Sequence, residues 1–447
     1  MPTLTVSTDC LLEGAPPGLN TAIKDHLTID NPQYVAAKRY GRWIGKRLKP
    51  KLYYFQESAE GMRFPRGFSN QAVLLCREHT GASPEIIDKR RLLQEISLQF
   101  SGILRPYQQI AVDRVAGRSF GVLEAGTGSG KTVMALALIA TRRQPALIVV
   151  HTKELLYQWQ DRIREFLDLE AGLIGDGHYR ILPVTVAIVN SARKRITDLV
   201  PHFGHLIVDE CHRVPAALFT DVVANFDCHY LLGLSATAFR SDDGLTKLIY
   251  TFMGDRIHKV DQDELMATGA IVKPRLIRKE TGFSYPYRGD YHALIKALTR
   301  HEGRNRMIID DICRAADDSG TVLVVSDRVG HCEIFERHLQ QRGIAAALLT
   351  GQTPPEQRAA IVEAVQKGEL QVLVATIQLI GEGFDCSGLS SLFLTTPITF
   401  EGRLLQVIGR IMRPGKNKEA RVFDYLDDAV SVLRRSGQIR MKALAGL

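Results

Sequence analysis

The chain has 447 residues, which is enough for two or three domains that each bury a core. Its composition, 45% hydrophobic and 24% charged residues, is that of an ordinary globular protein, and no apolar run is long enough to cross a membrane as a helix. The formal net charge of +8 suits a polyanionic partner such as nucleic acid, without requiring one.

The seven cysteines are scattered along the chain and form no C-x-x-C pair. This spacing argues against a zinc ribbon or an iron–sulfur cluster and is typical of free thiols in a reducing compartment. The N-terminus lacks the charged and then apolar pattern of a signal peptide. We therefore expect a cytoplasmic protein, in the host cytoplasm if a phage encodes it.

The first hundred residues show few periodic elements and cluster basic and aromatic side chains. Residues 31–55 read NPQYVAAKRYGRWIGKRLKPKLYYF, without one acidic residue. Lysine and arginine neutralise phosphates, and aromatic faces stack on bases. We predict a nucleic-acid-binding accessory domain over residues 1–100; a solvated basic surface above core aromatics is the alternative. The candidate contacts are Arg39, Arg42, Trp43, Lys46 and Arg47.

Two further regions, residues 101–270 and 271–447, alternate short apolar runs with helix-like segments. This alternation predicts an α/β fold with one parallel sheet in each region. In the first region, the predicted strands cover 119–125, 146–150, 184–189, 205–210 and 230–237, and the helices cover 132–143 and 154–167. In the second, the strands cover 321–326, 371–376 and 391–397, a helix covers 331–343, and a short basic amphipathic tail at the end is expected to fray.

The stretch EAGTGSGKT, residues 124–132, joins a predicted strand to a predicted helix. A phosphate-binding loop needs glycines for its turns, a lysine for the β- and γ-phosphates and a hydroxyl for Mg²⁺, here supplied by Lys131 and Thr132. Ala125 stands where the general pattern has glycine. We predict that ATP binds this loop through Gly126, Thr127, Gly128, Ser129, Gly130, Lys131 and Thr132.

Two carboxylates follow the predicted strand HLIV in the stretch HLIVDECH, residues 205–212. Ligands bind at the carboxyl ends of the strands in open α/β sheets, and a phosphate loop needs a carboxylate there. We predict that Asp209 holds Mg²⁺ together with Thr132 and that Glu210 orients the attacking water. Taken alone, an Asp-Glu pair is usually a solvated strand end.

The segments VDECH (208–212), LSAT (234–237) and QVIGRIMRPG (406–415) resemble superfamily-two helicases and translocases in order and spacing. In that family the loop is commonly A-x-x-G-x-G-K-T, which matches residues 125–132. LRPYQ (104–108) resembles the adenine-recognising segment, with Arg105 and Gln108 as contacts. The resemblance implies two tandem RecA-like parallel-sheet lobes, 101–270 with the ATP site and 271–447, beside a small N-terminal α+β domain.

The resemblance also implies roles for residues further along the chain. Arg410 and Arg413, three residues apart on one face of a helix, would be arginine fingers for the γ-phosphate. Gln406 would join the same network as His212, and Ser235 and Thr237 would couple the ATP state to the second lobe. In IGEGFD (380–385), the residues expected to contact nucleotide and nucleic-acid backbone are Gly381, Glu382, Gly383 and Asp385.

GLSATAFRSDD (233–243) resembles the R-E-D segment of XPB-type helicases at Arg240 and Asp242, with Ser241 in place of the acidic residue. HEGRNRMI (301–308) resembles the start of the second lobe in XPB-like and UvsW-like enzymes. These resemblances favour an ATP-dependent DNA helicase or translocase acting on branched or duplex DNA. An RNA-directed helicase and an ATP-gated clamp without processive unwinding stay open, whereas the arginine pair argues against a P-loop kinase or transporter ATPase.

Overall fold

The computed structural model describes residues 1–39, 43, 45, 48–212, 216–236, 244–317, 320–381, 388–398, 401–413 and 419–445. The chain divides into two compact units. The first comprises Met1–Ala125 with Gly130–Val260, and the second comprises Gly126–Ser129 with Asp261–Leu447. Each unit is described by itself below.

The N-terminal module of the first unit is a small α+β fold. Its strands are β1 (Thr3–Val6), β2 (Asp9–Glu13), β3 (Thr28–Asp30), β4 (Lys51–Tyr53), β5 (Gln56–Glu57), β6 (Met62–Pro65) and β7 (Glu85–Asp88). Its helices are α1 (Pro17–Leu27), α2 (Pro32–Arg39), the 3-10 turn η1 (Arg66–Phe68) and α3 (Ser69–Thr80). The main sheet has the order β5-β6-β2-β1-β7, and β3 pairs with β4. Leu4, Leu12 and Phe64 belong to its core.

Lobe 1, the rest of the first unit, is built on one sheet whose strands are parallel except at the edge strand β11. The strands are β8 (Phe120–Glu124), β9 (Ala146–Val150), β10 (Gly172–Gly175), β11 (His178–Arg180), β12 (Val184–Ile188), β13 (His205–Val208), β14 (Tyr230–Ser235) and β15 (Arg256–Lys259). Among the described residues their order is β11-β10-β12-β9-β13-β14-β8-β15. Every residue of β9 and β13 is buried, as expected for strands covered by helices on both faces.

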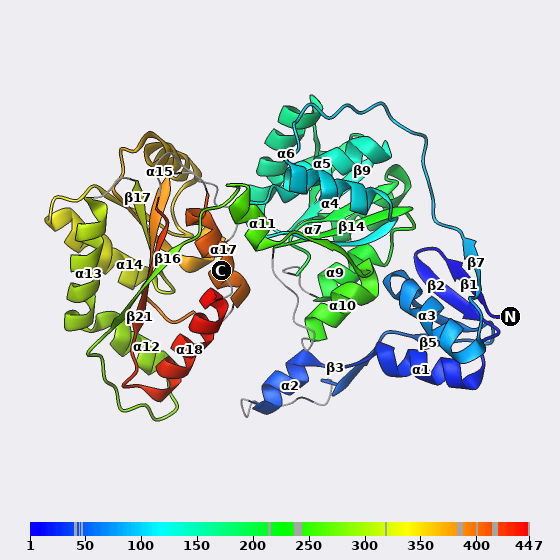
Figure 1. Ribbon diagram of the computed structural model, residues 1–447, viewed down its shortest axis with the longest axis horizontal. Helices are drawn as coiled ribbons and strands as arrows, with labels where there is room; N and C mark the ends of the chain where they lie inside the picture. The colour runs from blue at the N-terminus through cyan, green and yellow to red at the C-terminus, as the bar shows by residue number, and fades with distance from the viewer. Residues whose placement is uncertain are drawn as a thin grey trace. The chain divides into compact units, whose positions relative to one another are not determined.

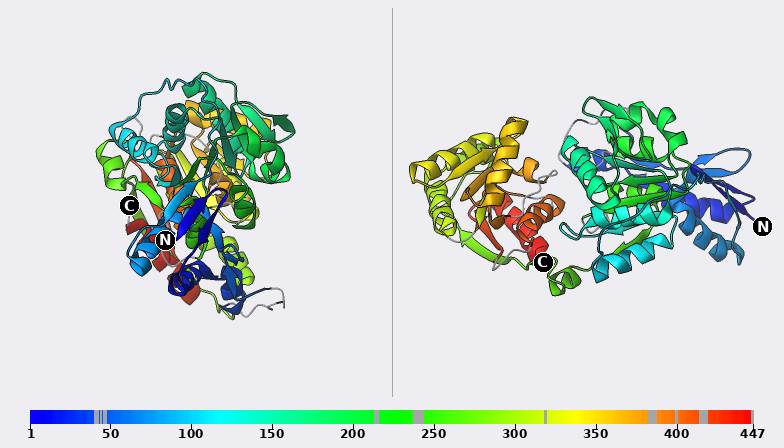
Figure 2. Two further views of the ribbon diagram at one scale, coloured as in Figure 1. Left: turned by 90° about the vertical axis from the view of Figure 1, so that its right-hand side faces the viewer. Right: turned by 90° about the horizontal axis from the view of Figure 1, so that it is seen from above.

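The helices of lobe 1 follow the predicted alternation with the strands. They are α4 (Pro106–Ala116), α5 (Lys131–Arg142), α6 (Lys153–Leu167), α7 (Val189–Lys194), α8 (Ile196–Leu199), η2 (Val200–His202), α9 (Ala216–Val223) and α10 (Gly244–Met253). The module lies beside α10, against which η1 and β3 pack (Figure 1; Figure 2). The accessory module and lobe 1 therefore form one compact unit.

Lobe 2, in the second unit, contains a second parallel sheet with the order β16-β21-β20-β17-β19-β18. The strands are β16 (Arg275–Glu280), β17 (Thr321–Ser326), β18 (Ala346–Leu349), β19 (Val372–Thr376), β20 (Leu389–Leu394) and β21 (Arg421–Leu426). The helices are α11 (Gln262–Ala267), α12 (Tyr291–Arg300), α13 (Glu302–Ala316), α14 (Val329–Gln341), α15 (Pro355–Lys367), α16 (Ile377–Gly381), α17 (Glu401–Ile411) and α18 (Ser431–Ala445). In Figure 1, α13 and α14 cover one face of this sheet, and α17 and α18 the other.

The predicted α/β fold class with two parallel sheets is confirmed, with differences in detail. The edge strand β11 runs antiparallel to β10, because Asp176 and Gly177 adopt positive φ values of 50° and 85° and close a tight hairpin. The expectation that the C-terminal tail frays is wrong: residues 431–445 form α18, whose Arg440 makes a buried ion pair with Asp424 of β21 at 2.7 Å. The domain boundaries at residues 100 and 270 stay predictions.

None of the helices within the described ranges is both long enough and apolar enough to cross a membrane.

Candidate nucleotide site and nucleic-acid surface

The candidate nucleotide site lies at the carboxyl edge of the lobe 1 sheet. There Ser235 of β14 is paired in register with Glu124 of β8, and the amide of Ala125 donates to the Ser235 carbonyl oxygen at 2.9 Å. The amide of Asp209 donates to the Val149 carbonyl oxygen at 3.0 Å. The ends of β8, β9, β13 and β14 thus bring segments that are far apart in sequence to one place.

The loop from Gly126 to Gly130 has the backbone that its glycines predict. Gly128 and Gly130 have φ values of 87° and 82°, in the left-handed region that favours glycine. A Cβ at Gly130 would also lie 2.4 Å from Nε2 of Gln108. The buried side chain of Gln108 therefore lies against the loop, and its Oε1 accepts a hydrogen bond from the Arg105 amide at 2.9 Å. The helix α5 begins directly after the loop, at Lys131.

Lys131 and Glu210 form an ion pair at the centre of the site. The Lys131 ammonium lies 3.5 Å from a Glu210 carboxylate oxygen and donates to the Ala125 carbonyl oxygen at 3.2 Å. Glu210 has a φ of 46°, an unfavourable value for a residue with a side chain, and such backbone strain is concentrated at functional sites. The predicted catalytic residues Lys131 and Glu210 therefore contact each other directly.

Asp209 is buried beside this pair, and both of its oxygens are held by hydrogen bonds. Oδ1 accepts from the Glu210 amide at 2.9 Å, and Oδ2 accepts from Nε1 of Trp159 at 2.8 Å. Burial, together with the Glu210 charge, raises the pKa of Asp209 to about 6, although Lys131 and the Trp159 hydrogen bond act in the opposite direction. A buried carboxylate whose charge is incompletely balanced suits a bound divalent cation.

His212 links the carboxylates to β14. Its Nδ1 lies 3.0 Å from the Ser235 hydroxyl oxygen and 3.4 Å from a Glu210 carboxylate oxygen. The structure thus brings together five predicted residues: Lys131, Asp209, Glu210, His212 and Ser235. Thr127, Ser129 and Thr132 lie in the same loop and at the start of α5, and Ser129 is fully buried.

Trp159 is the residue of this site that the sequence interpretation missed. It is fully buried on α6, and its indole fixes the orientation of Asp209. The available signal was one of the two tryptophans of the chain at a buried position of an amphipathic helix that follows β9. Such a pattern is equally typical of an ordinary core residue.

Two family models match this chain. "Type III restriction enzyme, res subunit" matches residues 101–240, and "Helicase conserved C-terminal domain" matches residues 304–415. The chain is 27% identical over 336 residues to the "Probable helicase D10" of Escherichia phage T5, covering 74% of this chain and 73% of that protein. It is also 27% identical over 374 residues to the "DNA 3'-5' translocase XPB2" of Sulfurisphaera tokodaii, covering 75% and 84%.

The chain is a superfamily-two helicase, similar to phage helicases and to proteins named XPB. It is therefore an ATP-dependent helicase enzyme. Among solved structures it is similar to T4 UvsW, with 17% identity, a TM-score of 0.45 and coverage of 99% of this chain and 97% of that one.

In the second lobe of this helicase, Gln406 and Arg410 lie on α17, with Gln406 buried. The prediction that Arg410 and Arg413 share one face of a helix is wrong, because α17 ends at Ile411 and Arg413 lies in a bend beyond it. The reason is visible in the sequence: Pro414 disfavours the helical conformation at the residue before it.

The segment 301–308, which resembles the start of the second lobe in related helicases, is structural in this chain. His301 caps α13, and Arg304 makes a buried ion pair with Asp427 at 2.9 Å. Asn305 accepts from Nε2 of His331, whose Nδ1 lies 2.9 Å from the Ser326 hydroxyl. Burial lowers the pKa of His331 to about 3, so this ring is neutral. The segment ties α13 to β17, α14 and β21.

Several predicted residues fall outside the described ranges. They are Arg42, Lys46, Arg47, Thr237, Arg240, Ser241, Asp242, Glu382, Gly383 and Asp385, together with the side chain of Arg39, whereas Gly381 is the last residue of α16. Of the predicted nucleic-acid contacts, Trp43 is described, and its side chain is 90% exposed. An indole so exposed is available for stacking.

Proposed function

We propose that this helicase is an Mg²⁺- and ATP-dependent DNA translocase that acts on branched or duplex DNA. It unwinds forks and migrates junctions in replication, recombination or repair. The observation that carries the proposal is the combination, in one compact unit, of the Lys131–Asp209–Glu210 cluster with the basic and aromatic module. The name of the XPB2 relative, a DNA translocase, supports DNA as the substrate.

The residues present fit an ATP molecule with Mg²⁺. The glycine backbone and the α5 N-terminus suit phosphates, and Asp209 and Thr132 are oxygen ligands of the kind that Mg²⁺ takes. A cation held by Asp209 and Thr132 would supply the positive charge that offsets the developing charge of the transferred phosphoryl group. Gln108 and Arg105, which adjoin the loop, are the proposed contacts to the adenine.

The ion pair between Lys131 and Glu210 supports separate roles for the two residues, with Lys131 binding the phosphates and Glu210 orienting the water. When Lys131 turns to the phosphates, the Glu210 carboxylate is released to orient the attacking water. Nδ1 of His212 lies 3.0 Å from the Ser235 hydroxyl oxygen, so a movement of Glu210 would be transmitted through His212 to the end of β14. Arg410 and Arg413 are the proposed arginine fingers, and Gln406 lies about one turn before Arg410 on α17. Such groups change turnover by about 10³–10⁵-fold in other systems.

The N-terminal basic run is the proposed surface for the nucleic-acid backbone, with Trp43 as a stacking residue. An RNA-directed helicase and an ATP-gated clamp are the competing functions. RNA and DNA differ at the 2′-hydroxyl.

The deciding experiment compares ATP hydrolysis with single-stranded DNA, duplex DNA, forks, four-way junctions and RNA of matched sequence. We expect forks and junctions to stimulate hydrolysis most and to be unwound or migrated. Equal or greater stimulation by the matched RNA would refute a DNA-specific enzyme. Binding without ATP-dependent strand displacement or junction migration would identify a clamp instead.

A further inference from the structure

A cavity of about 310 Å³ lies between the N-terminal module and lobe 1. Tyr53, Phe55, Asp9 and Arg63 of the module line it on one side. Phe252, at the end of α10, and Val223 of α9 line it on the other. This volume is at the lower end of the range for small-ligand pockets, roughly 300–1,000 Å³, and exceeds what one water needs.

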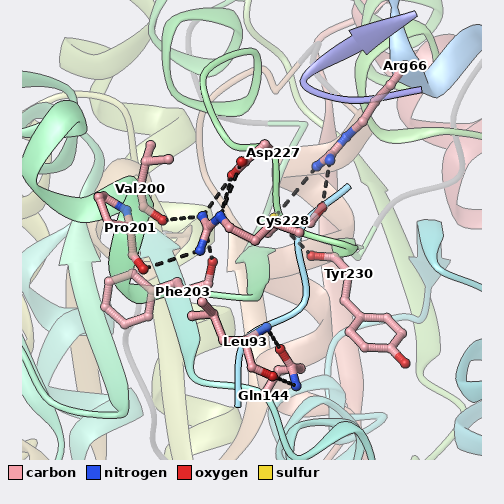
Figure 3. A network of polar contacts seen from close by, with 10 residues as sticks. Arg66, Leu93, Gln144, Val200, Pro201, Phe203, Asp227, Cys228 and Tyr230 are labelled. Atoms are coloured by element: carbon pink, nitrogen blue, oxygen red, sulfur yellow. Dashed lines mark hydrogen bonds and ion pairs between the residues drawn. The ribbon is translucent and has the colours of Figure 1, made fainter. Parts of the chain in front are cut away.

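The two walls of the cavity are held at a fixed separation. Arg66, which is buried, donates to the Cys228 carbonyl oxygen at 2.7 Å and reaches its sulfur at 3.7 Å (Figure 3). A Cβ at Gly67 would lie only 2.5 Å from the backbone nitrogen of Gly254, so the backbones of η1 and the end of α10 touch. Tyr54 packs edge-on against Phe252 and contacts the cores of both module and lobe. The cavity is therefore a built feature of the unit.

A second set of contacts fastens the segment after β7 to lobe 1. Arg91 forms an ion pair with Asp227 at 2.7 Å and donates to the carbonyl oxygens of Val200, Pro201 and Phe203 (Figure 3). The buried Gln144 exchanges two hydrogen bonds with the backbone of Leu93. The module is therefore fastened to lobe 1 at two separate places, η1 and the segment after β7.

The lining selects a flat, uncharged ligand with polar edges. Tyr53 and Phe55 stand edge-to-face with ring centroids 6.0 Å apart, and the Tyr53 ring is 59% exposed. At the rim, Arg63 lies 3.6 Å from Asp9 and 3.3 Å from Glu60, so two carboxylates offset its positive charge. A phosphate would be repelled by the Asp9 carboxylate, whereas a nucleobase has aromatic faces for the rings and donors and acceptors for the rim.

Two exposed lysines lie close in sequence to Tyr53, which lines the cavity. β4 carries Lys51 and Tyr53 two residues apart, so both side chains lie on one face, and both are exposed. Lys49 precedes this strand and is exposed as well. Phosphates on these lysines would leave the neighbouring base beside the Tyr53 ring.

We propose that this cavity takes one unpaired nucleobase at a DNA branch point, stacked on Tyr53 and edged by Asp9 and Arg63, while Lys49 and Lys51 hold the flanking phosphates. This proposal rests on the proposed function, DNA binding, and deepens it. Extruding a base costs least where it is already unpaired, so the cavity favours a branch over continuous duplex. Because the module is packed on lobe 1, a base bound in the cavity would place the DNA branch point next to the lobe that carries the ATP site.

The test compares two forked DNAs that differ in one unpaired nucleotide at the branch, which carries either its base or an abasic site. The phosphates are identical, so the ratio of the two affinities isolates the base contact. Because stacking on an aromatic side chain is worth about 5- to 150-fold in affinity per base, we expect wild-type protein to bind the abasic fork that much more weakly. Tyr53→Ala should bind both forks equally, and Tyr53→Phe should keep the discrimination.

The control is Tyr179→Ala, because Tyr179 is also a partly exposed tyrosine of this unit, at 45%, but lies on the distant edge strand β11. It should discriminate as wild type does. Equal affinity of wild-type protein for the two forks, or discrimination that survives Tyr53→Ala, would overturn the proposal and favour an aromatic side chain of a protein partner as the occupant. If wild-type protein shows no DNA-stimulated ATP hydrolysis, the proposed function itself is refuted. This outcome differs from equal affinity for the two forks, which refutes only the base-binding cavity.

Discussion

At the carboxyl edge of lobe 1, two carboxylates, Asp209 and Glu210, share the single ammonium of Lys131. At the seam between module and lobe, by contrast, the Arg66 and Arg91 guanidiniums end on backbone carbonyl oxygens, and Arg91 also pairs with Asp227. The first cluster is short of positive charge and includes the strained Glu210 backbone, whereas in the second Arg91 has both a carboxylate and three carbonyl oxygens as partners. Unbalanced charge and backbone strain, as in the first cluster, are typical of a site that binds a charged ligand. A well-paired arginine such as Arg91 is typical of a structural contact between two parts of a fold.

The largest expected effect comes from removing the only ammonium of the first cluster among the described residues. Lys131→Ala should lower ATP turnover by roughly 10²–10³-fold, because a positive group aimed at developing charge is lost. Binding of forked DNA, measured by fluorescence anisotropy, should persist. Lys153→Ala, which changes an exposed lysine at the start of α6, is the matched control. Turnover retained in Lys131→Ala would show that the loop is not the ATP site.

The second prediction concerns the contact between module and lobe 1 where the two backbones are closest, at Gly67 and Gly254. In Gly67→Ala the added methyl would meet backbone atoms of Phe252 and Gly254 at 2.6 and 2.5 Å, so the module must shift. We expect a loss of about 1–3 kcal/mol in the free energy of unfolding, as for other overpacked sites. Urea unfolding and limited proteolysis between module and lobe would measure it.

The control for the seam is Gly18→Ala on α1 of the same module, where the nearest atom is a His79 ring nitrogen at 3.6 Å. It should leave the unfolding midpoint unchanged or raise it slightly, since alanine favours a helix over glycine. Equal stability of Gly67→Ala and wild type would mean that the module is not closely docked.

The two regions also differ in how far the sequence predicts them. The strand of five apolar residues at 146–150, the glycines of the loop and the Asp209–Glu210 pair are local patterns, so a few neighbouring residues determine them. The contact of Arg66 with Cys228 joins residues 162 positions apart, and no local pattern specifies it. Two misses did have local signals, namely Asp176-Gly177 for the hairpin and Pro414 for the end of α17.

A smaller effect is expected from the hydrogen bond that orients Asp209. Because the pKa of Asp209 is raised to about 6, its carboxylate takes up a proton as the pH falls through that value, and Mg²⁺-dependent turnover should fall with it. Trp159→Phe removes a donor to the charged form, so the pKa should rise further and the acid limb of the rate profile should move to higher pH. The measurement is the rate of ATP hydrolysis against pH at limiting Mg²⁺.

Trp43→Phe is the control for this profile, because it changes the other tryptophan of the chain, which is exposed on the module. Its acid limb should coincide with that of wild type. An unshifted limb in Trp159→Phe would mean that Asp209 does not set the acid limb. The comparison also tests whether the conflict in the first cluster is electrostatic, since a purely steric change at position 159 would lower the rate equally at every pH.

The smallest effect concerns the lysines that lead to the cavity. Each phosphate contact contributes about 0.7–0.9 to the slope of the logarithm of affinity against the logarithm of salt concentration. Lys51→Gln should therefore reduce that slope by somewhat less than one and weaken binding of all DNAs alike, while Lys194→Gln, on α7, should leave it unchanged. An unchanged salt dependence in Lys51→Gln would mean that the DNA backbone does not contact Lys51. Lys51→Gln can be compared directly with Tyr53→Ala. If the first changes only the salt dependence and the second changes only the discrimination against the abasic fork, then β4 contacts phosphate through Lys51 and base through Tyr53, two residues apart.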